Sequence, residues 1–217
     1  MKKAVIFDLD GTLVNSLPDI SFAMNRALTL EGLVPHSEDR YRYFVGDGVI
    51  HLSERAAGER KDLAEKLREH YVPYYHEHSR DRSYVYDGIA DMLVRLQREG
   101  ILLSVFTNKD QPDAEDVIQH YFPSAPFRVI QGRQPGIPIK PDPEGVFRIL
   151  EKLGTSKEET VYVGDTATDM KCGRNAGLFT FGVLWGFRTR EELENSGAKC
   201  IVSTPEELTG LVLRQAL

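Results

Sequence analysis

The sequence has little of what would place the protein outside a reducing compartment or inside a membrane. Its 217 residues include only two cysteines, Cys172 and Cys200, which are too few for a disulfide framework. The N-terminus does not resemble a signal peptide, and no apolar run approaches the roughly 20 residues that cross a bilayer. We therefore expect a cytoplasmic protein without a membrane partner, in which both cysteines are small apolar core residues.

The sequence also has fewer positively charged residues than negatively charged ones. Lysine and arginine number 27 against 33 aspartates and glutamates, which gives a formal net charge of −6. This balance argues against nucleic acid as the main partner, although a local basic pocket could still hold a small phosphate ester. With 41% hydrophobic residues the chain can bury a substantial core, and its length allows one large domain or a domain with an inserted module.

An apolar run near the N-terminus ends in two carboxylates. Residues 4–7 are typical of a buried strand in a parallel sheet, and Asp8 and Asp10 share one face where that strand ends. Like charges at this spacing repel and lose hydration, so a bound cation or a shared proton is expected. A simple Asp-Gly turn is the alternative. The longer string Asp-x-Asp-Gly-Thr directly after an apolar strand is more specific and favours a chemical site.

Further apolar or β-branched runs recur along the chain, and helical patterns separate most of them. The predicted strands are residues 101–106, 127–130, 160–163, 180–184 and 200–202. Apolar faces predict helices near 89–96 and 146–153, followed by Gly100 and Gly154. This alternation predicts an α/β fold: a Rossmann-like parallel sheet with helices on both faces and a ligand crevice at the carboxyl ends of the strands.

One region breaks the alternation. Between Ser16 and Ser83 the sequence shows only helical segments, at 18–30 and at about 61–78, the second interrupted by Pro73. The region is too long for a plain loop. We predict an inserted α-helical cap domain at residues 16–83, standing over a core made of residues 1–15 and 84–217.

Two later sites offer donors for a phosphoryl group. Thr107 and Asn108 end the strand 101–106, where a hydroxyl, an amide and backbone N–H groups can donate to phosphoryl oxygens. An ordinary helix N-cap is the alternative for this pair. Lys140 lies between Pro138 and Pro141, which limit the backbone and aim the ammonium as a point charge; solvated surface is the alternative for a lone lysine.

A third site follows the strand 160–163. Asp165 and Asp169 lie four residues apart, so both can point inward from the start of the next helix. Carboxylates at a helix N-terminus are often only caps. Mg²⁺, however, prefers hard oxygen ligands and usually takes one or two protein carboxylates, a number that Asp8 and Asp165 would supply.

Together, the four sites resemble the four motifs of the haloacid dehalogenase superfamily of phosphohydrolases, in the same order and on the same element types. The resemblance covers the whole chain. It implies that Asp8 is the nucleophile that forms an aspartyl-phosphate, and that Asp10 is the general acid and then the general base. Because the dehalogenases of the superfamily lack this second acid, Asp10 favours phosphate esters over haloacids.

The resemblance also assigns the remaining positions. Thr107 and Lys140 would hold and neutralise the phosphoryl oxygens. Mg²⁺ would be bound by Asp8, the backbone carbonyl of Asp10 and Asp165, with Asp169 bonding through water or positioning Lys140. Such a site fits the chemistry, because phosphoryl transfer depends mainly on positioning and positive charge.

The cap offers a clue to the substrate. Gly46, Asp47 and Gly48, together with residues 53–56, resemble the cap loop of bacterial phosphoglycolate phosphatases, and residues 185–187 and 190–193 also resemble that branch of the superfamily. A flexible turn between two cap helices is the alternative. The resemblance implies a small phosphorylated metabolite, with phosphoglycolate as the best choice. The predicted substrate-binding residues are Thr107, Asn108, Lys140, Gly46, Asp47 and Gly48.

Several functions stay open at this point. Relatives within the superfamily hydrolyse pyrophosphate or sugar phosphates, and others are mutases of the β-phosphoglucomutase kind. A non-catalytic phosphate-binding regulator would keep the fold without turnover. A monomer and a homodimer are both compatible with the sequence.

Overall fold

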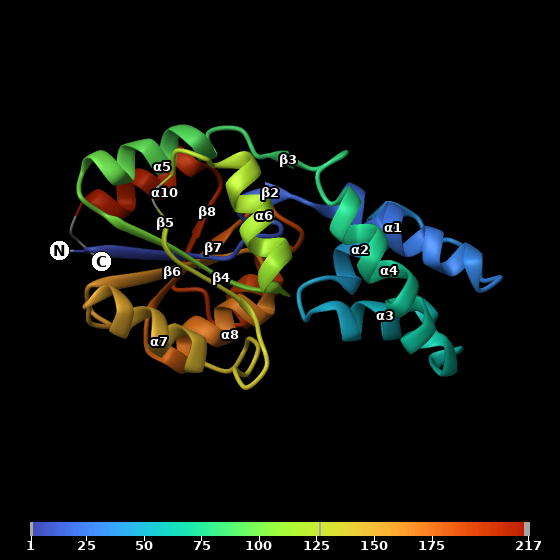
Figure 1. Ribbon diagram of the computed structural model, residues 1–217. Helices are drawn as coiled ribbons and strands as arrows, with labels where there is room; N and C mark the ends of the chain where they lie inside the picture. The colour runs from blue at the N-terminus through green and yellow to red at the C-terminus, as the bar shows by residue number, and fades with distance from the viewer. Residues whose placement is uncertain (1, 126, 215–217) are drawn as a thin grey trace.

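The computed structural model describes residues 2–125 and 127–214, and six strands within them form one parallel sheet (Figure 1). Their spatial order is β5-β4-β1-β6-β7-β8. The strands are β1 (Ala4–Phe7), β4 (Leu102–Asp110), β5 (Phe127–Arg133), β6 (Thr160–Gly164), β7 (Phe179–Val183) and β8 (Cys200–Val202). Every adjacent pair in this sheet is parallel, so the predicted Rossmann-like sheet is confirmed.

Strand β1 lies at the centre of the sheet. Ala4 pairs with Leu102 of β4 on one side and with Thr160 of β6 on the other. The strand order therefore runs in opposite directions from β1, which makes its carboxyl end the topological switch point where ligands bind in open α/β sheets. Asp8 follows β1 directly and lies at this point.

Helices cover both faces of the sheet, as predicted (Figure 1). The helices of this part of the chain are α5 (Ile89–Arg98), α6 (Gln111–Tyr121), α7 (Glu144–Leu153), α8 (Ala167–Ala176), α9 (Arg190–Asn195) and α10 (Pro205–Leu213). Alternation along β1 explains the two layers, because Val5 and Phe7 pack with α5, α6 and α10, whereas Ile6 packs with α7 and α8. Across residues 2–125 and 127–214, no helix combines the length and apolar character of a membrane span.

A helical segment lies beyond the carboxyl end of the sheet. It contains α1 (Leu17–Leu30), α2 (Glu38–Phe44), α3 (Val49–Ala57), the short 3₁₀ helix η1 (Lys61–Leu63) and α4 (Ala64–His78). Helices α1–α4, together with Phe187 of the core, share a hydrophobic cluster that is distinct from the two clusters of the sheet. A two-stranded antiparallel ribbon, β2 (Val14–Asn15) with β3 (Tyr84–Val85), joins the segment to the rest of the chain (Figure 1).

Helix α4 differs from the prediction. It continues through Pro73 instead of being interrupted there. The buried residues Leu67, Tyr71 and Tyr75 recur on one face of α4, and this packing outweighs the hydrogen bond that the proline removes. Helices α2, α6, α9 and α10 were not predicted from the sequence, because their apolar faces are short.

Two helical glycines provide a test of this packing. Gly145 in α7 is buried, and a β-carbon there would overlap the ring of Phe106, whereas a β-carbon at Gly210 in α10 would have its nearest neighbour at 4.0 Å. We expect Gly145→Ala to lower the free energy of unfolding by about 1–3 kcal/mol, because the ring is buried and has no room to yield. Gly210→Ala should raise it by about 0.5–1 kcal/mol through the lower entropy of the unfolded chain. Urea denaturation measures both, and equal effects would contradict the packing at α7.

Candidate active site

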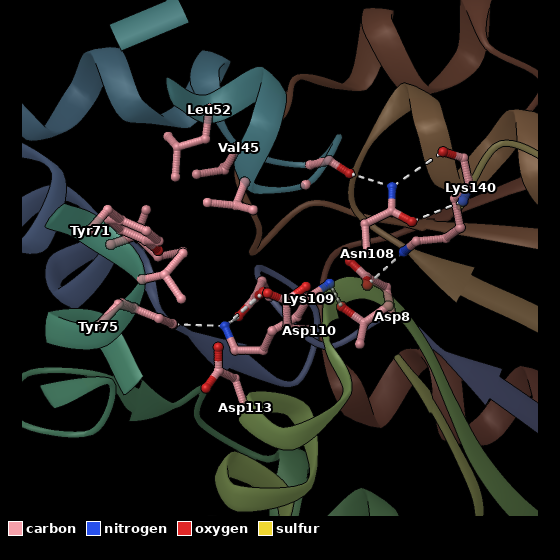
Figure 2. Close-up of a pocket in the computed structure, with 17 residues that line it drawn as sticks. Asp8, Val45, Leu52, Tyr71, Tyr75, Asn108, Lys109, Asp110, Asp113 and Lys140 are labelled. Atoms are coloured by element: carbon pink, nitrogen blue, oxygen red, sulfur yellow. Dashed lines mark hydrogen bonds and ion pairs between the residues drawn. The ribbon is translucent and has the colours of Figure 1, made fainter. Parts of the chain in front are cut away.

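A buried lysine lies between two carboxylates at the carboxyl edge of the sheet. Nζ of Lys140, in the loop before α7, is 2.7 Å from Oδ1 of Asp8 (Figure 2) and 2.7 Å from Oδ1 of Asp169. The backbone N–H of Asp8 donates to the carbonyl of Val163 in β6 at 2.8 Å, which continues the pairing of the sheet. All three charged side chains are almost entirely inaccessible to solvent. Three sequence motifs therefore meet in one ion-pair cluster.

The start of α8 orients Asp169. Thr166 is the N-cap, and its backbone N–H and hydroxyl donate to Oδ2 of Asp169 at 3.0 and 2.6 Å. This reciprocal capping leaves Oδ1 of Asp169 for Lys140. Asp169 thus has both of the roles considered for it from the sequence, because it caps helix α8 and it also holds Lys140.

Asp165 is held from two other loops. Its Oδ1 accepts from the hydroxyl of Thr12 at 3.2 Å, and its Oδ2 accepts from the backbone N–H of Phe187 at 2.7 Å. The backbone approaches closely here, since a β-carbon at Gly11 or at Gly186 would overlap the carboxylate. Gly11 also has a φ of +89°, a conformation that L side chains rarely adopt. The glycine in the Asp-x-Asp-Gly-Thr string is therefore required by Asp165 as well as by the turn.

The charges of this cluster do not balance. Burial raises the pKa of Asp8 well above its usual range, and the neighbouring Asp169 raises it further. Burial, with a contribution from Asp169, raises the pKa of Asp165 to about 7. Burial disfavours the Lys140 ammonium, but Asp169 and Asp8 outweigh it and raise the pKa of Lys140. One ammonium therefore faces more carboxylate charge than it can neutralise.

The same carboxylates have the composition of a cation site. One oxygen from each of Asp8, Asp165 and Asp169 lies within 4.8 Å of the others, and all are buried. Hard oxygen donors of this kind suit a divalent cation such as Mg²⁺, which would also offset the excess negative charge. The predicted metal ligands therefore come together, although the carboxylate of Asp10 has a different partner.

Asp10 pairs with a lysine that the sequence analysis did not single out. Nζ of Lys109 lies 2.9 and 3.0 Å from the two carboxylate oxygens of Asp10, and it donates to the hydroxyl of Tyr75 at 2.7 Å. Figure 2 shows Tyr75 reaching Lys109 from α4. Lys109 follows Thr107 and Asn108 directly, so its position at the end of the same strand was a signal in the sequence that it lies near the site. Tyr75 carries no local signal beyond its place on a buried helix face.

Asn108 links the core to the helical segment. Its side-chain amide donates to the carbonyl of Gly46 at 3.0 Å and to that of Lys140 at 3.2 Å, and its oxygen accepts from the N–H of Lys140 at 2.8 Å (Figure 2). Thr107 is buried beside it, and its hydroxyl accepts from the N–H of Lys109 at 3.2 Å. The Asn108 amide is thus already engaged with backbone, whereas the hydroxyl proton of Thr107 is available for a ligand.

The loop 45–48 touches the core at further points. Asp47 accepts from the hydroxyl of Thr168 at 2.6 Å and forms an ion pair with Arg55. Nη2 of Arg188 donates to the carbonyl of Val45 at 3.0 Å. Gly46 and Gly48 line the cavity beside Asp8, while Asp47 lines a separate groove near Lys140. The two glycines therefore face the reaction centre more directly than Asp47.

A cavity of about 70 Å³ lies between the carboxyl edge of the sheet and the helical segment. The core contributes its polar wall: Asp8, Asp10, Thr107, Asn108, Lys109, Asp110, Asp113 and Lys140. The helical segment contributes mainly apolar side chains and two tyrosines: Ile20, Val45, Val49, Leu52, Tyr71, Val72 and Tyr75. Charged chemistry is therefore confined to one side of the cavity, and the other side encloses it (Figure 2).

Comparisons with known proteins agree with this geometry. The family model of haloacid dehalogenase-like hydrolases matches residues 5–183. The chain belongs to this family. The match spans the segment from β1 to β7 and includes each of the buried charged residues described above.

Members of the family similar to this chain are curated phosphatases. N-acetylmuramic acid 6-phosphate phosphatase of Pseudomonas aeruginosa is 32% identical over 98% of this chain and 95% of its own length. Phosphoglycolate phosphatase of Vibrio cholerae is 30% identical over 89% of each chain. A crystal structure from Lactobacillus delbrueckii subsp. bulgaricus, provisionally named a phosphoglycolate phosphatase, superposes with a TM-score of 0.93, 29% identity and coverage of 99% and 100%. The whole chain, including the helical segment, thus has a known counterpart.

The buried cluster provides a stability test. We expect Lys140→Met to lower the free energy of unfolding at neutral pH by about 3–5 kcal/mol, because it leaves Asp8 and Asp169 buried without their ammonium. The double variant Lys140→Met, Asp169→Asn should be more stable than Lys140→Met, because one of the two buried carboxyl groups that lost the ammonium is replaced by a neutral amide. Urea denaturation without divalent cations measures this, and a double variant no more stable than Lys140→Met would contradict the account.

Proposed function

We propose that the protein is a Mg²⁺-dependent phosphomonoester hydrolase acting through an aspartyl-phosphate on Asp8, with 2-phosphoglycolate as its best substrate. The observation that carries the proposal is the buried cluster of Lys140 with Asp8, Asp165 and Asp169 at the switch point of the sheet. Membership of the hydrolase family and the curated phosphatases among its relatives support it. The small cavity favours a small phosphorylated acid.

The domain division is part of the proposal. Residues 16–83 would form the cap and residues 1–15 and 84–217 the core. The separate hydrophobic cluster of α1–α4 and the ribbon of β2 with β3 support this division. The cap would close the cavity above the reacting phosphate and exclude water from it.

The reaction divides into two displacements at phosphorus. In the first, Oδ of Asp8 attacks the phosphoryl group, the bond from phosphorus to the ester oxygen breaks, and Asp10 gives its proton to the leaving alcohol. In the second, Asp10 takes a proton from water, which attacks the aspartyl-phosphate and releases phosphate and free Asp8. Both steps require Asp8 and Asp10 to reach the bound phosphate, and both residues line the cavity.

Positive charge would come from two sources. Lys140 is held beside Asp8 and would neutralise the phosphoryl oxygens, while the Thr107 hydroxyl would donate to one of them. Mg²⁺, held by Asp8, Asp165 and the carbonyl of Asp10, would polarise the phosphoryl group and offset the carboxylate charge. Asn108, Gly46, Asp47 and Gly48 would complete the substrate site, with Asn108 joining the cap loop to Lys140. Asp169 would act mainly by positioning Lys140.

N-acetylmuramic acid 6-phosphate is the second candidate substrate. The relative of that name is 32% identical to this chain over nearly its whole length, an identity comparable to that of the phosphoglycolate phosphatases. Both reactions release phosphate from a monoester, so both would use the same residues of the core. The two substrates differ in size, so the space that the cap leaves beside the phosphate would decide between them.

The nucleophile is tested by substitution. We expect Asp8→Asn to lower phosphate release by roughly 10⁴-fold or more, because the amide cannot attack phosphorus. The fold should persist, since the Asn oxygen can still accept from Lys140. Phosphate release and circular dichroism check the two parts, with the exposed Asp91→Asn as a matched control that keeps full activity. Unchanged turnover in Asp8→Asn would exclude the proposed intermediate.

The metal site is tested by thermal unfolding. Mg²⁺ at 100 times its dissociation constant should stabilise the wild type by about 2.7 kcal/mol and raise its Tm. Asp165→Asn removes one of the clustered carboxylates and should suppress the shift, while Asp91→Asn should retain it. A Mg²⁺ shift of the same size in Asp165→Asn would argue against Asp165 as a ligand.

The substrate is decided by a screen in the presence of Mg²⁺. We expect phosphoglycolate to have a higher kcat/KM than N-acetylmuramic acid 6-phosphate, sugar phosphates or pyrophosphate. A wide preference for another of these would replace phosphoglycolate. An isomeric phosphate in place of free phosphate would identify a mutase, and tight ester binding without turnover would identify a regulator.

A further inference from the structure

Lys109 is a second buried lysine of the cavity, and the reaction outlined above gives it no role. Only 5% of its side chain is exposed. Its ammonium contacts both carboxylate oxygens of Asp10, at 2.9 and 3.0 Å, and the hydroxyl of Tyr75 at 2.7 Å (Figure 2). It also lies 4.7 Å from the centre of the Tyr75 ring. These contacts occupy the three N–H donors of the ammonium.

Removing an ammonium from water is costly unless a charged partner compensates. Asp113 and Asp110 also line the cavity, but Asp113 is engaged by Nδ1 of His76 at 2.6 Å, and Asp110 forms an ion pair with Arg133. Asp10 is the carboxylate that Lys109 itself contacts. The burial of Lys109 is therefore coupled to Asp10 specifically.

The contact restricts Asp10. Its side chain is 20% exposed, and its backbone lies in the turn after β1, so the pairing of the sheet does not hold its carboxylate. The charged contacts of the Lys109 ammonium with both oxygens hold the Asp10 carboxyl group in place. We propose that Lys109 is a positioning residue for Asp10, and that Tyr75 makes this positioning depend on the helical segment. The inference rests on the proposed phosphatase function.

The chemistry indicates when Lys109 matters. As the bond from phosphorus to the ester oxygen breaks, the proton of Asp10 moves to that oxygen and Asp10 becomes a carboxylate, which the Lys109 ammonium stabilises. An alkoxide needs this proton in order to leave, whereas acetate leaves as the anion, because carboxylic acids ionise near pH 4. Loss of Lys109 should therefore slow alkyl phosphates more than acetyl phosphate.

Tyr75 connects this effect to the helical segment. It lies on α4, where its ring stacks on Tyr71 with centroids 5.0 Å apart, and only its hydroxyl reaches the ammonium of Lys109. Tyr75→Phe keeps the ring and the stacking but removes this hydrogen bond. It therefore isolates the link between α4 and Asp10.

The experiment compares three phosphate compounds of similar size, two alkyl esters and one acyl phosphate. Phosphoglycolate has a poor leaving group and a carboxylate, 2-hydroxyethyl phosphate has a poor leaving group without the carboxylate, and acetyl phosphate has a good leaving group. For Lys109→Met, we expect the ratio of kcat/KM for 2-hydroxyethyl phosphate to that for acetyl phosphate to fall about tenfold or more, since kcat/KM reports the first displacement. Tyr75→Phe should lower the same ratio by a smaller factor. The exposed Lys152→Met is the matched control and should leave the ratio unchanged.

Every other outcome rejects either the role of Lys109 or the proposed function. An equal loss with all three compounds would show a merely structural role for Lys109 and overturn the inference. A loss confined to phosphoglycolate would mean that Lys109 binds the carboxylate of the substrate, which also overturns it. If Lys109→Met does not fold, as judged by circular dichroism, Tyr75→Phe decides alone, and an unchanged ratio in it rejects the inference. Failure of the wild type to hydrolyse any ester would instead reject the proposed function.

Discussion

The site depends on one buried ion-pair cluster, in which the ammonium of Lys140 lies 2.7 Å from carboxylate oxygens of Asp8 and Asp169. The three charges come from segments that are far apart in the sequence, and none of them could be buried alone without a large desolvation cost. The parallel sheet solves this problem by ending β1 and β6 at the same edge, and the capping box of α8 aims Asp169 inward. Fold and site are thus stabilised by the same contacts.

Much of the core site could be predicted because its signals are local. An apolar strand followed by carboxylates defines the ends of β1 and β6, and such ends meet at one edge in any parallel sheet. The Thr-x-x-Asp spacing at Thr166 likewise predicts a capped helix start. For these residues the sequence neighbours determine where the side chain points. Asp8, Asp165 and Asp169 were therefore predicted from local signals, whereas the role of Lys140 was implied by the family resemblance; the structure brings all four together.

The helical segment was predicted less completely, since its contacts are tertiary. The continuity of α4 through Pro73 follows from the burial of Tyr71 and Tyr75, which no local rule contains. The link between Asn108 and Gly46 joins residues 62 positions apart, and the sequence predicts each of them only as a separate donor or turn. Asp47 is tied to Thr168 and Arg55, a contact that depends on how the segment sits over the core. Contacts of this kind can be identified only from the three-dimensional structure.

The two aspartates after β1 are distinguished by their lysines. Asp8 shares Lys140 with Asp169, and all three of these charged side chains come from the core. Asp10 shares Lys109 with Tyr75 of α4, so its surroundings include the segment that closes the cavity. In the proposed reaction Asp10 donates and then accepts a proton, and Tyr75 gives the helical segment a contact with the lysine that holds it. The two lysines therefore distinguish the two proposed roles: the lysine beside the proposed nucleophile Asp8 pairs with core carboxylates, whereas the lysine beside the proposed proton donor Asp10 also contacts α4.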